Sequence, residues 1–140
     1  MKKLLLFVVF VFTLLNAKEI TLYERLGGYQ QISNILTDFH IRLKNDKQLG
    51  RFWRYRGTDG KERELQLLID FVCASTGGPV HYSGRDMFTT HKGMQISQSD
   101  WKIFIKYLKV SLKKYNIKKT ETKEVLSFID NLKSTMVEVK

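Results

Sequence analysis

An all-helical fold is the structural class that this 140-residue sequence predicts. Apolar residues recur every three to four positions through most of the chain, which is the spacing of amphipathic helices. No stretch of more than a few residues alternates between apolar and polar side chains, as half-buried strands do. Two glycine pairs and one proline divide the pattern into four longer helical segments and several short ones.

The first half of the chain predicts a short helix followed by a long one. Residues 22–26 form the short helix, which ends at the glycine pair 27–28. A long helix starts near Gln30 and carries one apolar stripe, formed by Ile32, Ile35, Leu36, Phe39 and Leu43. Residues 54–60 are polar and contain two glycines, so a loop is expected there.

Three further helical segments are expected after residue 60. The segment 61–76 is apolar around more than half of its circumference, which predicts a buried helix ending at Gly77-Gly78-Pro79. Ser97 and Asp100 form a capping box, which opens a helix with Trp101, Phe104, Ile105 and Leu108 directed inward. A last helix begins near residue 120 and continues through residue 136.

The N-terminal segment has the organisation of an export signal. Lys2 and Lys3 precede an apolar run over residues 4–15, and Ala17 offers a cleavage point. The run is shorter than the roughly 20 residues that span a bilayer. We therefore expect a signal peptide over residues 1–17, a single domain over residues 18–140, and an exported, periplasmic protein without a stable membrane span after cleavage. An uncleaved N-terminal anchor is the alternative.

Charge and cysteine content restrict the classes of partner. Removing residues 1–17, which contain two lysines and no acid, lowers the formal charge from +10 to +8. The lysines are scattered, and the clusters 113–114 and 118–119 are short, so we expect a solvated surface and no nucleic-acid binding. Cys73 is the only cysteine, which excludes an internal disulfide, and its apolar neighbours predict a buried thiol.

The stretch "GRDMFTTHKGMQIS" at residues 84–97 holds one histidine, His91, in a segment too short and glycine-rich for a long helix. A lone histidine makes a poor zinc site, because zinc requires three or four protein ligands. Haem iron receives four nitrogens from the porphyrin, so one imidazole from the protein suffices. The surplus of Phe and Leu on the neighbouring helices would line such a flat apolar cofactor. A surface or capping role is the alternative.

The sequence resembles the group I truncated haemoglobins from about Thr21 to Glu138. The motifs that carry the resemblance are "LYERLGGYQQI" at 22–32, "DFHIRL" at 38–43, "GRFW" at 50–53, "FVCASTGGP" at 71–79 and "YSGRDMFTTHKGMQIS" at 82–97. The resemblance implies a truncated globin fold, in which helices form a two-over-two sandwich, and haem b (iron protoporphyrin IX) as the cofactor.

The resemblance also implies roles for individual residues. His91 matches the proximal ligand of the haem iron, and Met87 a haem contact one turn earlier. Phe39 matches the phenylalanine that flanks the distal pocket. The further expected haem contacts are His40, Phe52, Trp53, Leu67, Leu68, Phe71 and Phe104. Arg85 and Lys92 are expected to lie near the haem propionates from their charge and position, whereas His81 is expected to be exposed.

The chain departs from the family on the distal side. His40 stands where the family usually has tyrosine, and Glu64, Leu67 and Leu68 occupy the places where glutamine often faces the ligand. Gln66 would fit only after a local shift of the helix. We expect His40 to donate a hydrogen bond to the bound ligand. The oxygen affinity should then vary between about pH 5 and 8, as the histidine titrates. Ligation of the iron, or a ring directed away from it, are the alternatives.

The expected function is an exported haem globin that reversibly binds oxygen, nitric oxide or carbon monoxide. Turnover, such as nitric oxide dioxygenation or a peroxidase-like reaction, would need an external reductant, for instance a periplasmic electron donor, because the sequence carries no flavin or nicotinamide module. One alternative is a globin-shaped binding or adaptor protein without haem. Another is a basic helical module for nucleic acid or an anionic membrane, against which the export signal and the lack of aromatic–basic interleaving count. No catalytic residues are assigned in the globin interpretation.

Overall fold

The computed structural model describes residues 19–139, which are helical over most of their length. The expected signal peptide lies outside the described residues. None of the described helices is long and apolar enough to cross a membrane. In chain order the elements are α1 (Leu22–Arg25), α2 (Gly28–Asn45), the 3-10 helix η1 (Leu49–Trp53), α3 (Thr58–Ser75), α4 (Met87–His91), α5 (Gln98–Lys114), α6 (Lys119–Asp130) and α7 (Lys133–Met136).

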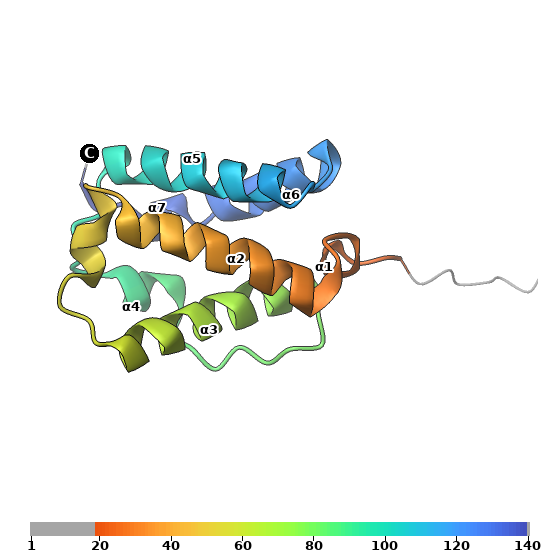
Figure 1. Cartoon of the computed structure of the whole chain (residues 1–140), viewed down its shortest axis with the longest axis horizontal. Helices are drawn as coiled ribbons and strands as arrows, with labels where there is room; N and C mark the ends of the chain where they lie inside the picture. Colours follow the sequence, from red (N-terminus) through yellow and green to blue (C-terminus); the bar gives the residue numbers. More distant parts are fainter. Residues whose placement is uncertain (1–18, 140) are drawn as a thin grey trace, which may run out of the picture.

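Helix α2 lies at the centre of the molecule, with α3 packed on one side and α5 on the other (Figure 1). Helix α6 returns beside α5, so α2 with α3 and α5 with α6 form two layers. The short helix α4 lies near α3 and packs against α7 at one end of the molecule. At the opposite end, α1 is tied to α6 by ion pairs from Arg25 to Glu121 and Glu124.

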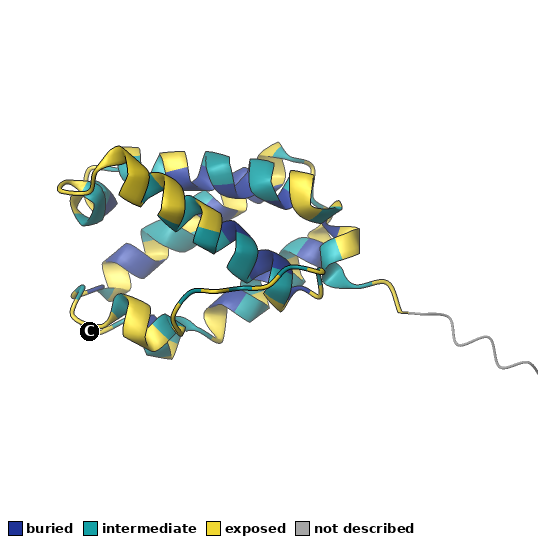
Figure 2. Ribbon diagram, turned by 90° about the horizontal axis from the view of Figure 1, so that it is seen from below, coloured by how far each residue is buried: buried dark blue, intermediate teal, exposed yellow. Residues whose placement is uncertain are grey.

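The core lies between these layers, where the apolar stripes of the four long helices meet. Buried residues follow the inner faces of the ribbons, and exposed residues follow the outer faces (Figure 2). Burial of each large apolar side chain contributes about 1.5–3 kcal/mol. The largest contributors from the four helices include Ile32, Ile35, Leu36, Phe39, Leu43, Ile69, Val72, Trp101, Leu108, Leu112, Val125 and Ile129. The thiol of Cys73 is fully buried, as predicted.

Helix ends follow the local signals in the sequence. The capping box of Ser97 and Asp100 is present at the start of α5, as predicted, and Thr21 forms a second one with Glu24 at α1. Gly27 and Gly28, with φ of 94° and 72°, make the left-handed turn between α1 and α2. Gly78 admits the Tyr23 ring, which any side chain at that position would meet.

Two predicted boundaries are wrong. Helix α3 begins at Thr58 rather than 61, so Gly60 lies in its first turn, where glycine is tolerated because the backbone N–H groups there have no helical partners. The last predicted helix is broken after Asp130 into α6 and α7. The break falls at exposed Asp130 and Asn131, two residues of low helix propensity.

Candidate functional site

His91 is the last residue of α4, a five-residue helix whose N-terminus is capped by the Asp86 side chain. Its ring nitrogen Nδ1 lies 2.8 Å from the carbonyl oxygen of Met87. Because a carbonyl oxygen only accepts hydrogen bonds, Nδ1 carries the proton and Nε2 keeps its lone pair. Histidines that ligate metals typically have this arrangement, in which the second nitrogen donates to a backbone carbonyl.

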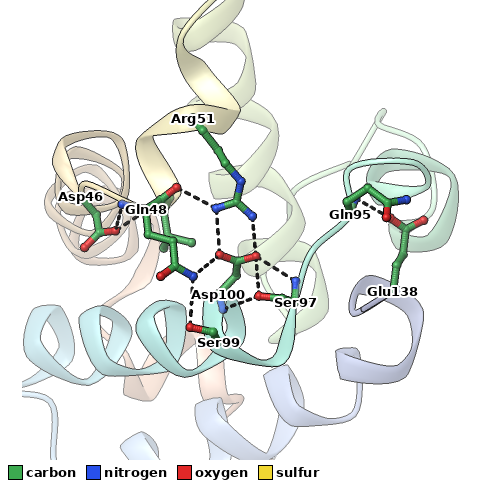
Figure 3. Close-up of polar contacts among 9 residues, drawn as sticks. Asp46, Gln48, Arg51, Gln95, Ser97, Ser99, Asp100 and Glu138 are labelled. Atoms are coloured by element: carbon green, nitrogen blue, oxygen red, sulfur yellow. Dashed lines mark hydrogen bonds and ion pairs between the residues drawn. The ribbon is translucent and has the colours of Figure 1, made fainter. Parts of the chain in front are cut away.

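The backbone after His91 is held by the C-terminal end of the described chain. Gly93 and Gln95 adopt left-handed conformations, with φ of 81° and 57°. The carboxylate of Glu138 accepts hydrogen bonds from both of their N–H groups, at 2.7 Å and 2.6 Å, and these bonds lower its pKa. The contact with Gln95 is drawn in Figure 3. Glu138 therefore fixes the turn through which the chain leaves α4.

His40 lies on α2 and is 2% exposed. Its ring packs edge-on against Trp53, with 5.6 Å between ring centroids. Within the described residues its Nε2 atom has no hydrogen-bond partner and lies 3.9 Å from Glu64 Oε1. Burial, with a smaller contribution from the Lys44 cation, lowers the pKa of His40 to about 4. The imidazole is therefore neutral at neutral pH, and a titration between pH 5 and 8 is the wrong expectation for this residue.

Glu64 was not among the expected haem contacts, yet it joins the groups around His40. Its Oε1 atom accepts a hydrogen bond of 2.8 Å from Trp53 Nε1. Its Oε2 atom forms an ion pair, 2.8 Å long, with Arg56 Nη1, and accepts no hydrogen bond from the described residues. With both oxygens engaged, Glu64 is a weak acceptor for His40. The only sequence signal for Glu64 is its spacing from the glycine pair that ends α3.

Gln66 does not replace the missing distal glutamine. It is exposed, and its amide donates hydrogen bonds of 2.8 Å to both the Tyr29 hydroxyl and the Asp70 carboxylate. These contacts hold it on the outer face of α3.

An ion pair between exposed Arg51 and buried Asp100 connects η1 with the start of α5 (Figure 3). Arg51 donates two hydrogen bonds, of 2.9 Å and 2.6 Å, to the carboxylate of Asp100, which is 1% exposed. Gln48 and the Ser97 backbone donate to the same carboxylate. Arg51 holds the pKa of Asp100 well below its ordinary value. Since Arg51 precedes Phe52 and Trp53, the ion pair fixes the aromatic pair relative to the segment that follows α4.

Comparison with known proteins assigns the fold and the family. The sequence profile of the bacterial-like globins matches residues 21–138. The chain belongs to the bacterial-like globin family. This globin is 26% identical to a group 1 truncated haemoglobin of Tetrahymena pyriformis, over 84% of its own length and 94% of the relative's. It is 27% identical to a group 1 truncated haemoglobin of a Nostoc species, over 84% and 97% of the two chains.

Solved structures confirm the two-over-two fold. The crystal structure of the Tetrahymena pyriformis truncated haemoglobin, in its Fe(III) form, superposes with a TM-score of 0.76 at 25% identity, covering 84% of this globin and 97% of that chain. A group II truncated haemoglobin from Bacillus anthracis shares the fold, with a TM-score of 0.75 at 17% identity and coverage of 86% and 98%. The expected all-helical truncated globin fold is confirmed.

Truncated haemoglobins bind haem, and the residues of this globin fit that cofactor. The side chains predicted to contact haem are apolar or aromatic, and most are half-buried rather than sealed in the core. The half-buried members are Phe52, Trp53, Leu67, Leu68, Phe71, Met87 and Phe104. Helix α3 is thus less buried than predicted, since its Leu67, Leu68 and Phe71 face this region. No group of three or more His, Cys, Asp or Glu in residues 19–139 could hold a metal ion by protein ligands alone.

Aromatic contacts link these predicted haem-contacting side chains to the core. Phe39, which is 1% exposed, packs edge-on against Phe104 with 5.0 Å between centroids. Leu68 joins both phenylalanines in lining an apolar cavity of about 40 Å³ between α2, α3, α5 and α6. His81 is exposed, as predicted. Arg85 and Lys92 are exposed as well, and their role toward propionates stays a prediction.

Proposed function

We propose that this globin would hold haem b through Nε2 of His91 and would reversibly bind oxygen, or another diatomic gas, at the haem iron. The hydrogen bond between His91 Nδ1 and the Met87 carbonyl carries the proposal, because it fixes the tautomer and the direction of the free nitrogen. Haem supplies the iron to which the gas binds. The half-buried apolar side chains described above would exclude water from the cofactor.

His40 is the polar group that we assign to the ligand side. Its neutral ring carries one proton, and Nε2 has no partner among the described residues. Trp53, whose ring packs against His40, already donates its Nε1 proton to Glu64. His40 can therefore donate a hydrogen bond to a polar gas ligand without first breaking a bond within the protein. We favour this donor role over ligation of the iron, because His40 is fixed on the long helix α2.

The apolar cavity supports the proposal that the ligand is small and uncharged. Its volume of about 40 Å³ is enough for one diatomic molecule, and its lining includes Phe39, Leu68 and Phe104. Apolar cavities of this kind stay dry, whereas uncharged gases dissolve in them readily. The cavity therefore offers oxygen, nitric oxide or carbon monoxide a place beside the proposed haem contacts.

The cellular setting of the proposal rests on the sequence of residues 1–17. A cleaved export signal would place the globin in the periplasm, where any turnover depends on an outside electron donor. Intact-mass measurement on protein from the envelope fraction should show a chain that begins at Lys18. A full-length chain in the cytosolic fraction would contradict export but not the haem proposal.

Absorption spectroscopy of the purified protein tests the central proposal. We expect about one haem b per chain, a ferrous spectrum without added gas that is five-coordinate, and a reversible spectral shift on addition of carbon monoxide. A six-coordinate ferrous spectrum would instead assign His40 as a second iron ligand. A folded chain that takes up no haem when haemin is added would overturn the proposal and favour the adaptor function.

A further inference from the structure

A basic groove with an apolar floor runs between α5 and α6. Its volume is about 1110 Å³, and residues of both helices and of the turn between them line it. The floor is formed by Trp101, Ile105, Ile117 and Leu126, of which Trp101 is the most buried. Six exposed lysines line the groove as well: Lys102, Lys109, Lys113, Lys118, Lys119 and Lys123. We refer to this feature as the lysine groove.

The charge of the lysine groove is uncompensated within residues 19–139. Asp130 is the one carboxylate among the described lining residues, and none of the six lysines forms an ion pair with a described residue. The neighbouring Lys114, which lies outside the groove lining, is by contrast paired with Asp38. Six like charges around one apolar floor create a strong positive potential, which attracts an anionic partner.

We propose that the lysine groove docks an acidic amphipathic helix of a partner protein. Lys102 and Lys113 are eleven positions apart on α5, which corresponds to a groove about 17 Å long. The volume then gives a mean cross-section of about 65 Å². A helix with side chains is roughly 10–12 Å wide, which gives a cross-section of roughly 80–110 Å². The groove can therefore hold more than half of the thickness of such a helix. Its apolar stripe would cover the floor, and its acids would face the lysines.

Other occupants match the groove less well. A second copy of this chain would bring two sets of six lysines together, and like charges oppose association. The chain's own residues 1–18 carry lysines and no acid, so they do not complement the groove either. A flat anionic membrane would meet the lysines and leave the recessed apolar floor uncovered. A helix with both acidic and apolar faces satisfies both parts of the groove.

Trp101 provides a direct reporter of docking. Its indole lies on the groove floor and stacks on Phe104, with 5.3 Å between centroids and planes 17° apart. The protein has one other tryptophan, Trp53, which packs against His40 away from the groove lining. The indole N–H resonance of Trp101 should therefore shift on docking, whereas that of Trp53 should not. The inference does not depend on haem binding.

The test uses a helical peptide of about 14 residues, with leucines at i, i+3, i+4 and i+7 spacing and glutamates elsewhere. A matched peptide carries lysine in place of glutamate. Binding to the purified protein is measured by fluorescence anisotropy and by the two indole resonances, after reduction with dithionite and under carbon monoxide, so that any bound haem is ferrous and diamagnetic. We expect the acidic peptide to bind, to shift Trp101, and to weaken as salt rises. The basic peptide should not bind.

Charge reversal at the groove tests the site. Lys113→Glu with Lys119→Glu should weaken binding of the acidic peptide by roughly tenfold or more. The control pair, Lys47→Glu with Lys106→Glu, changes the net charge equally outside the groove lining and should leave affinity within about twofold. Equal losses in both pairs, an unshifted Trp101, or no binding at millimolar peptide would overturn the proposal. Tighter, Lys113-dependent binding to phosphatidylglycerol vesicles would overturn it in favour of a membrane surface.

Discussion

His91 and His40 are held by opposite means. His91 is half-buried at the end of a five-residue helix, and hydrogen bonds fix both its ring and the turn after it. His40 lies within an 18-residue helix, is 2% exposed, and is held by packing while its Nε2 stays unpaired. A short segment needs hydrogen bonds to aim a side chain, whereas a long helix aims it through the core. The first arrangement suits a permanent bond, and the second suits a weaker contact with a passing ligand.

Removing the His91 imidazole should produce the largest effect. His91→Ala is expected to lose most bound haem, because the porphyrin then has no protein ligand for its iron. The haem-free variant should also melt at a lower temperature than the haem-loaded parent. A cofactor that binds only the native state stabilises it by about 4 kcal/mol when its free concentration is about a thousand times its Kd. Haem content and melting temperature are the measurements, with His81→Ala as the exposed-histidine control. Full haem retention with an unchanged spectrum would refute the proximal assignment.

The pH dependence of stability should separate the buried histidine from the exposed ones. Folding lowers the pKa of His40 from 6.5 to about 4. Between pH 6.5 and pH 4, His40 is therefore protonated in the unfolded chain and neutral in the native chain. The free energy of unfolding of the apoprotein should therefore fall as pH drops from 6.5 to 4, by up to about 3 kcal/mol. Denaturant titrations of the parent and of His40→Leu measure this difference.

The control for this titration is His81→Leu, which removes an exposed histidine and should retain the full pH dependence. Measurements stay above pH 4, because Asp38 and Asp100 have lowered pKa values and lose their ion pairs only in stronger acid. An identical pH dependence in the parent and in His40→Leu would show that His40 is not the buried titrating group.

Glu138 should matter for His91 without touching it. Glu138→Gln keeps the shape of the side chain but places an amide N–H₂ against one of the two backbone donors, so one hydrogen bond is lost. We expect haem release to become roughly tenfold faster, as for other groups that orient a metal ligand from behind. The iron–histidine stretching frequency of the ferrous protein should shift as well, which a general loss of stability would not cause. An unchanged stretching frequency together with an unchanged haem release rate would show that Glu138 does not help to position His91.

The smallest expected effect concerns the contact between His40 and the ligand. One distal hydrogen bond contributes about 0.5–1.5 kcal/mol net, so His40→Leu should speed oxygen dissociation roughly 2- to 13-fold. Carbon monoxide is less polar when bound, and its dissociation rate should change less. Stopped-flow off-rates for both gases test this, with Gln66→Leu as the outward-facing control. If neither rate changes, His40 is not the distal donor.

Local signals predicted most of the fold. Residue spacing gave the long helices, and the Ser97–Asp100 box and the glycine pairs gave several ends. The start of α3 was misplaced because glycine counts as a helix breaker in general but not in a first turn, where Gly60 lies. The second role of Asp100, as the buried partner of Arg51, was not predictable. The two residues are 49 positions apart, and no local pattern pairs them.

A site residue could be proposed from the sequence where a side chain would act alone, as at His91, and its role stays a prediction. The site could not be predicted where the position of one side chain depends on contacts with several residues distant in the sequence. Spacing along α3 put Glu64 at a distal position but not among the haem contacts, because it does not reveal that Trp53 and Arg56 hold the carboxylate there. The neutral state of His40 likewise depends on burial by the whole fold.

The Glu138 contact also sets an order of events as the chain is made and folded. Gly93 and Glu138 are 45 positions apart, so the turn after His91 has no carboxylate to hold it until those intervening residues have been synthesised and packed. Helices α2 and α3, which pack against each other, both precede this turn in the chain. If His91 ligates haem as proposed, a chain that lacks its last residues would offer the iron an imidazole on an unsecured turn, and firm capture of the cofactor would follow packing of the C-terminal end.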